Sequence, residues 1–63
     1  MTSFEHLEAA IEAAKLMHVC LLAAHDAPNE PALRACMGAF ETHCRELHDH
    51  LRPVIEKLAR NTP

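Results

Sequence analysis

Six histidines and three cysteines are the residues of this 63-residue chain that could do chemistry. Metal ligands on one helix must recur every three or four positions, because only then do they share a face. Glu41, Cys44 and His48 meet this spacing and are the candidate metal ligands, but no C-x-x-C or H-E-x-x-H motif accompanies them. Cys44 also falls in an apolar seam, where a free cysteine packs as a small core residue. We therefore predict no metal site and no cofactor, and keep a metal-binding or metal-sensing bundle as an alternative.

Catalysis has little support in the sequence, which lacks tyrosine and tryptophan and has a single glycine, so that no phosphate-binding loop can form. A cysteine nucleophile with a histidine base needs a pocket that two helices do not supply. We predict a protein that is not an enzyme and has no catalytic residues. His18 and His25 share one helix face, and we expect them at buried or boundary positions, where protonation would weaken an interface.

Local signals divide the chain into two helices. Thr2 with Glu5 three residues later forms a capping box, and Asn29 suits the cap of a second helix. The prolines at 28 and 31 mark the turn between them. The single domain over 1–63 is therefore predicted to be all-α, with a helix over about 3–25, a turn over 26–30 and a helix over about 31–60 that is kinked near Pro53.

Apolar periodicity predicts how these helices pack. The first helix is apolar nearly all round from Leu16 to Ala24, so one partner helix cannot cover it. The second helix carries a heptad seam of Leu33, Met37, Phe40, Cys44, Leu47, Leu51, Val54 and Leu58. We predict an antiparallel helical hairpin that dimerises into a four-helix bundle. The predicted interface residues are Leu16, Met17, Cys20, Leu21, Ala24, Met37, Phe40, Cys44, Leu47, Leu51 and Val54.

Charge limits the partners and the compartment. The formal net charge is −3, and the basic face typical of nucleic-acid binders is missing. The first helix begins with Glu5, Glu8 and Glu12 and the second ends with basic residues, so antiparallel folding should bring opposite charges together. The longest apolar run is too short for a membrane span. An odd cysteine count and the absence of a leader-like start lead us to expect a cytoplasmic protein with reduced thiols.

The segment from Cys44 to His50, Cys-Arg-Glu-Leu-His-Asp-His, resembles part of the second helix of Rop, the plasmid RNA-modulating family. The resemblance places Cys44 and Leu47 at that family's core positions. It implies a short helical hairpin that dimerises into a four-helix bundle and binds RNA. The family's RNA-contacting face uses lysine, asparagine, glutamine and phenylalanine on the first helix, where this chain has glutamates that repel phosphate. An RNA-binding dimer of this kind is therefore the second alternative.

The sequence as a whole predicts a small regulatory or adaptor protein of the kind that bacteria and phages use. Its partners are expected to be a second copy of itself and another protein, bound through helix faces, with no membrane and no nucleic acid involved.

Overall fold

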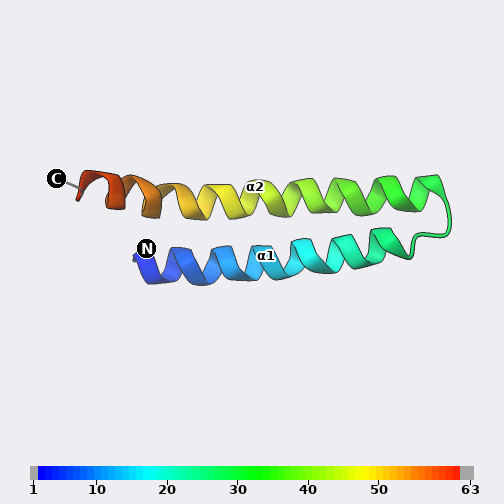
Figure 1. The fold of residues 1–63 in the computed structure, drawn as a ribbon, viewed down its shortest axis with the longest axis horizontal. Coiled ribbons are helices and arrows are strands. Elements are labelled where there is room, and N and C mark those ends of the chain that lie inside the picture. The colour runs from blue at the N-terminus through cyan, green and yellow to red at the C-terminus, as the bar shows by residue number, and fades with distance from the viewer. Residues whose placement is uncertain (1, 62–63) are drawn as a thin grey trace.

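Two α-helices joined by a short loop make up the part of the chain that the computed structural model describes, residues 2–61. Helix α1 spans Ser3–His25 and helix α2 spans Glu30–Arg60. The two helices run antiparallel, side by side, along the long dimension of a molecule that measures 51 × 16 × 16 Å (Figure 1). The prediction of an all-helical chain whose two helices pack together is confirmed, and residues 2–61 contain no strand.

Side-chain caps fix where the helices begin. The Oγ1 atom of Thr2 accepts a hydrogen bond from the amide of Glu5 at 3.1 Å, which is one half of the predicted capping box. The Oδ1 atom of Asn29 accepts from the amide of Ala32 at 2.9 Å. Pro31 lies in the first turn of α2, where its missing amide hydrogen breaks no helical hydrogen bond. These caps satisfy backbone groups that would otherwise lack partners at the helix starts.

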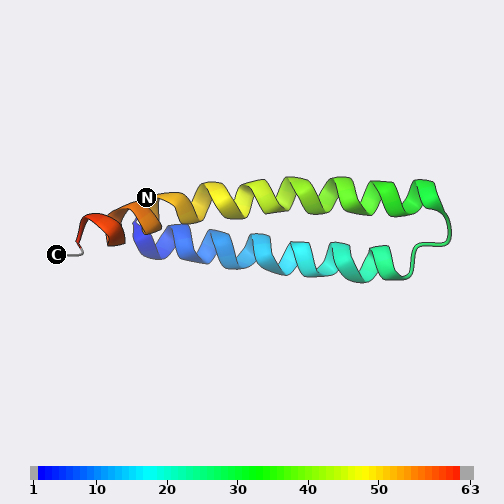
Figure 2. The ribbon, with the colours of Figure 1, turned by 45° about the horizontal axis from the view of Figure 1, so that its top comes forward.

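Helix α2 continues through Pro53. A proline inside a helix removes one backbone donor and crowds the preceding turn, which bends the helix. The last turns of α2, coloured orange and red, depart from the straight course of the rest of the helix (Figure 2). The bend therefore falls at the open end of the hairpin, beside the beginning of α1.

The contact between the helices follows a regular pattern of three and four residues, which we call the seam. All of its residues are buried or half-buried: Ser3, His6, Ala10, Ala13, Met17, Cys20 and Ala24 of α1, and Ala32, Cys36, Phe40, His43, Leu47, His50, Leu51 and Val54 of α2. The imidazole rings of His6 and His50 lie 5.9 Å apart, centroid to centroid, and fix the register. Antiparallel order then pairs Ala24 with Ala32 nearest the loop and Ser3 with Val54 at the open end.

Helix α1 covers only part of the heptad seam predicted for the second helix. Leu33, Met37, Cys44 and Leu58, four of its eight residues, are exposed in the hairpin. The apolar stripe of α2 is wider than one neighbouring helix can cover, and α1 packs against one edge of it rather than against its middle. Cys44, which we expected in the core, lies on the uncovered part of the stripe.

The seam has almost no core of its own. Ala10 and Ala13 are the only hydrophobic residues in the described part of the chain that are fully buried, each with 3% of its surface exposed. Alanine side chains let two helices approach closely, but they remove little apolar area from water. Most of the large apolar side chains of this chain must therefore lie elsewhere.

Antiparallel packing puts the acidic start of α1 and the basic end of α2 at the same end of the hairpin (Figure 1), but within residues 2–61 no ion pair joins the two helices. The two ion pairs that involve arginine stay within α2, from Arg34 to Glu30 at 2.7 Å and from Arg52 to Glu56 at 3.2 Å. Both join residues one helical turn apart and are exposed, so each contributes little to stability. In the same residues, neither helix combines the length and the apolarity that a membrane span requires.

Candidate functional site

Large apolar side chains of both helices are displaced from the seam by one position. In α1, Leu7, Ile11 and Leu21 each directly follow a seam residue. In α2, Leu33, Met37 and Ile55 do the same. Each residue advances a helix by about 100°, so a residue that follows the seam by one position points sideways out of the hairpin. Every helix therefore has an apolar flank beside its seam.

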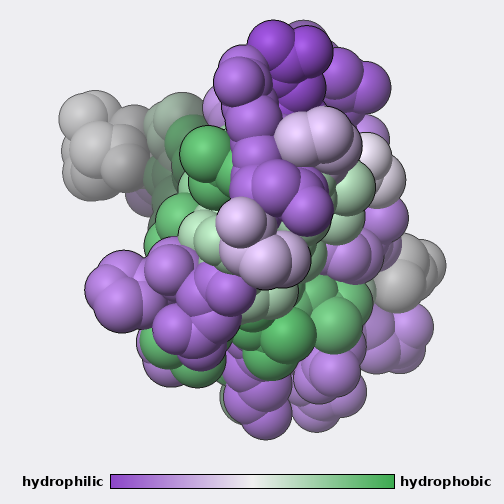
Figure 3. Space-filling model, turned by 90° about the vertical axis from the view of Figure 1, so that its right-hand side faces the viewer, coloured by the Kyte–Doolittle hydropathy of each residue, from purple (hydrophilic) through white to green (hydrophobic). Residues whose placement is uncertain are grey.

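The two flanks lie on the same side of the molecule. An approximate two-fold axis at right angles to both helices exchanges the two members of an antiparallel pair and reverses chain direction. Positions with the same offset from the seam therefore share a face. Figure 3 views the hairpin from the loop end, and hydrophobic surface reaches its left side beside both α2, above, and α1, below.

We call this surface the apolar face. It consists of the large apolar residues that directly follow seam residues and are exposed: Phe4, Leu7, Ile11 and Leu21 of α1 and Leu33, Met37 and Ile55 of α2. These residues are between 37% and 76% exposed. Exposed Ala14, His18, Cys44 and His48 complete the face near its middle. His18 is thus not at the buried or boundary position that we expected, and exposed His25 lies only 3.3 Å from the Asp26 carboxylate.

The predicted interface residues divide between the seam and the uncovered surface. Seven of them lie in the seam: Met17, Cys20, Ala24, Phe40, Leu47, Leu51 and Val54. Four are exposed: Leu16, Leu21, Met37 and Cys44. Leu21, Met37 and Cys44 belong to the apolar face, whereas Leu16 lies on the other flank of α1. The sequence identified the apolar side chains but could not divide them between contacts within the hairpin and contacts available to a partner.

The opposite flanks of the helices carry a different chemistry. The residues that precede the seam by one position include Glu5 and Glu12 of α1 and Glu46 and Asp49 of α2. Nearer the loop, the same side carries a smaller apolar patch formed by Leu16, Val19, Ala23, Ala35 and Ala39, all exposed. The hairpin is therefore two-sided, with one face that is mainly apolar and another that is divided between acidic residues and a smaller apolar patch.

The candidate metal ligands Glu41, Cys44 and His48 line a shallow hollow on α2 together with Phe40 and Arg45. Within residues 2–61, no group of three or more histidine, cysteine, aspartate or glutamate side chains is arranged to hold a metal ion. The cation of Arg45 at the same hollow also opposes a second cation. Helical spacing brought the three residues to one side of α2 without converging their donor atoms.

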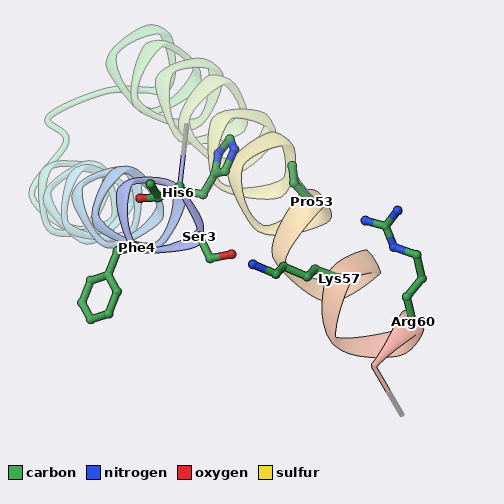
Figure 4. Close-up of a pocket in the computed structure, with 7 residues that line it drawn as sticks. Ser3, Phe4, His6, Pro53, Lys57 and Arg60 are labelled. Atoms are coloured by element: carbon green, nitrogen blue, oxygen red, sulfur yellow. The ribbon is translucent and has the colours of Figure 1, made fainter. Parts of the chain in front are cut away.

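Sequence reasoning missed a pair of histidines at the open end of the hairpin. His6 and His50 face each other across the seam, and the Nδ1 atom of His6 is shielded from solvent without a hydrogen-bond partner. His6 also lines a hollow beside the beginning of α1 together with Ser3, Lys57 and Arg60, shown in Figure 4. The pair could have been found only from the register of the two helices, because helical spacing pairs His50 with Glu46 and gives His6 no ligand.

No protein-family model matches this chain, and comparisons with curated proteins and with solved structures found no match either.

Proposed function

We propose that this chain is a small non-enzymatic regulatory or adaptor protein that self-associates, two hairpins burying their apolar faces against each other in a four-helix bundle. The apolar face is the observation that carries this proposal. It extends over both helices and along their length, as the contact surface of a second hairpin of equal length must. A two-fold dimer uses one surface on both copies, so this face must be able to pack against a copy of itself.

Surface area supports a second copy quantitatively. A folded monomer of this mass, 7.0 kDa, exposes about 4,000 Å². The hairpin exposes 4941 Å², an excess of roughly 900 Å². A stable protein interface buries about 800 Å² on each partner. Covering one face by a second copy would bring the exposed area per chain close to the value expected for its size.

The adaptor role rests on the surface that a dimer of this kind leaves free. The acidic flanks and the patch of Leu16, Val19, Ala23, Ala35 and Ala39 lie on the side opposite the apolar face. An amphipathic helix of a partner protein fits such a shallow, small-residue surface, with basic side chains directed at the flanking glutamates. A nucleic-acid partner is disfavoured because Glu5, Glu8 and Glu12 are all exposed on α1.

A matched pair of variants tests self-association. Met37→Glu places a charge on the apolar face, whereas Ala35→Glu places the same charge two residues away on the opposite flank. Met37→Glu should weaken dimerisation roughly 100-fold, because the charge would be buried without a partner. Ala35→Glu should leave it unchanged. Sedimentation equilibrium at several protein concentrations provides the measurement, and a wild-type chain that sediments as a monomer at high micromolar concentration would contradict the proposal.

The adaptor role needs a separate measurement. Proteins that the wild-type chain and Met37→Glu capture equally from the native host, and that Ala35→Glu fails to capture, would be partners of the opposite side. If every captured protein is lost with Met37→Glu alone, the apolar face is the adaptor surface instead, and the assignment of the two sides is reversed.

A further inference from the structure

We propose that His6 and His50 form a two-imidazole binding site for a divalent transition metal of the zinc, nickel or copper type, which would clamp α1 to α2 at the open end of the hairpin. The site goes beyond the proposed function and does not depend on it, because both histidines belong to one chain and lie in the seam rather than on the apolar face.

The separation of the rings is close to that of a metal-bound pair. A zinc–nitrogen bond of about 2.0–2.1 Å from each imidazole puts two ring centroids roughly 5 Å apart in a tetrahedral site. The centroids of His6 and His50 are 5.9 Å apart, with the ring planes inclined at 46°. Rings inclined at this angle are not stacked in parallel. A side-chain movement that shortens the centroid distance by about 1 Å would bring one nitrogen of each ring within bonding distance of the same ion.

An unpartnered nitrogen supplies the second observation. The Nδ1 atom of His6 is shielded from solvent and has no hydrogen-bond partner, which costs free energy in a folded protein. A neutral imidazole carries one nitrogen with a free lone pair, and this lone pair is what a transition metal binds. Metal coordination by Nδ1 of His6, or by its Nε2 after a flip of the ring, would make use of a lone pair that no contact within the hairpin uses.

Access and the remaining coordination positions come from the hollow at the beginning of α1. His6 lines it, and the hydroxyl group of Ser3 and the amine of Lys57 are directed toward each other across it (Figure 4). Water entering this hollow would complete the coordination of an ion held by two protein ligands. The charges of Lys57 and Arg60, which line the same hollow, oppose a cation and should keep the affinity moderate.

The ligand type determines which ions fit. Imidazole nitrogen is a borderline donor that suits zinc, nickel and copper, whereas calcium and magnesium prefer oxygen. The two side chains of the pair offer nitrogen donors. Zinc or nickel should therefore stabilise the hairpin, and calcium or magnesium at the same concentration should have no effect.

The experiment uses the chain without an affinity tag after treatment with a chelator. Zinc at 100 times its Kd should raise Tm by roughly 10 °C or more, measured by circular dichroism at pH 7.5. His6→Gln and His50→Gln should each abolish this shift, and His25→Gln should preserve it. Lys57→Gln should tighten zinc binding a few-fold, because it removes one opposing charge.

Two results would overturn the site. One is a zinc-induced shift that survives in both His6→Gln and His50→Gln. The other is a shift that disappears in Cys44→Ser or His48→Gln, which would move the metal to the face of α2. Because the glutamine variants could perturb folding, a titration of the wild-type chain with paramagnetic nickel provides an independent readout. The imidazole resonances of His6 and His50 should broaden before those of the other four histidines.

Discussion

The seam and the apolar face of this hairpin are built from different side chains. The seam joins the two helices through alanines, cysteines and histidines, with Phe40 and Leu47 among its few large apolar residues. The apolar face contains a phenylalanine, leucines, isoleucines and a methionine, and all of them are exposed in the hairpin. In most small domains the largest apolar side chains hold the chain to itself. Here they face outward, so much of the hydrophobic free energy available to the chain is still unused when the hairpin has closed.

Substitutions in the seam and substitutions on the apolar face should therefore have different effects. Changes in the seam act on the hairpin itself, whatever the state of association. Changes on the apolar face act on what covers it and should leave an isolated hairpin almost unaffected.

The largest effect is expected for Leu47→Asp. Leu47 is half-buried in the seam opposite Ala10, and an aspartate there would place an unpaired charge between the helices. We expect a loss of about 3 kcal/mol or more in the free energy of unfolding, enough to unfold the hairpin or to leave it only partly helical. Urea denaturation followed at 222 nm measures it. A variant as stable as the wild type would show that the seam does not run through Leu47.

A smaller and more discriminating test uses two neighbouring alanines. Ala13 is fully buried in the seam, and Ala14 is exposed on the apolar face. Ala13→Leu should destabilise the hairpin by about 1–3 kcal/mol, because the helices must move apart to admit the larger side chain. Ala14→Leu should be tolerated and should tighten self-association by adding apolar area. Equal effects of the two substitutions on thermal unfolding and on sedimentation would erase the distinction between the two surfaces.

The smallest effect is expected at Gly38, which belongs to neither surface. A Cβ atom placed there would meet nothing within 4 Å, and the residue lies in the interior of α2. Gly38→Ala should stabilise the protein by up to about 1 kcal/mol through helix propensity alone. Its Tm should rise by a few degrees while the association constant stays fixed. A change in association instead would mean that the back of α2 takes part in an interface.

The helices themselves could be predicted because their signals are local. Thr2 and Asn29 accept the amide hydrogen bonds expected of helix caps, and the all-helical composition leaves no alternative fold class. The register of the seam could not be predicted from the same signals. A heptad pattern identifies the centre of an apolar stripe, whereas α1 packs on the edge of that stripe, and this offset exposes Cys44. Nothing in the spacing of α2 alone contains this information.

The histidine pair was hidden for a related reason. His6 and His50 are far apart in the sequence, and their meeting depends on the length of the loop and on the three–four pattern of both helices together. Histidine is also not counted when apolar positions are used to find a seam. The helix spacing test instead selected Glu41, Cys44 and His48, which share a helix but not a coordination centre. Residue spacing within one helix cannot predict which residues of two different helices come into contact.

The position of each contact along the seam also predicts the order in which the contacts form during folding. The contact of Ala24 with Ala32 closes a loop of seven residues, whereas that of Ser3 with Val54 closes a loop of fifty. The entropic difference between the two closures is roughly 1.7 kcal/mol. Seam contacts near the loop should therefore form first, followed in turn by those toward the open end. Backbone amide hydrogens should exchange fastest at the open end and slowest beside the loop. An ion bound between His6 and His50 would slow amide hydrogen exchange at the open end, where local opening of the hairpin is most frequent.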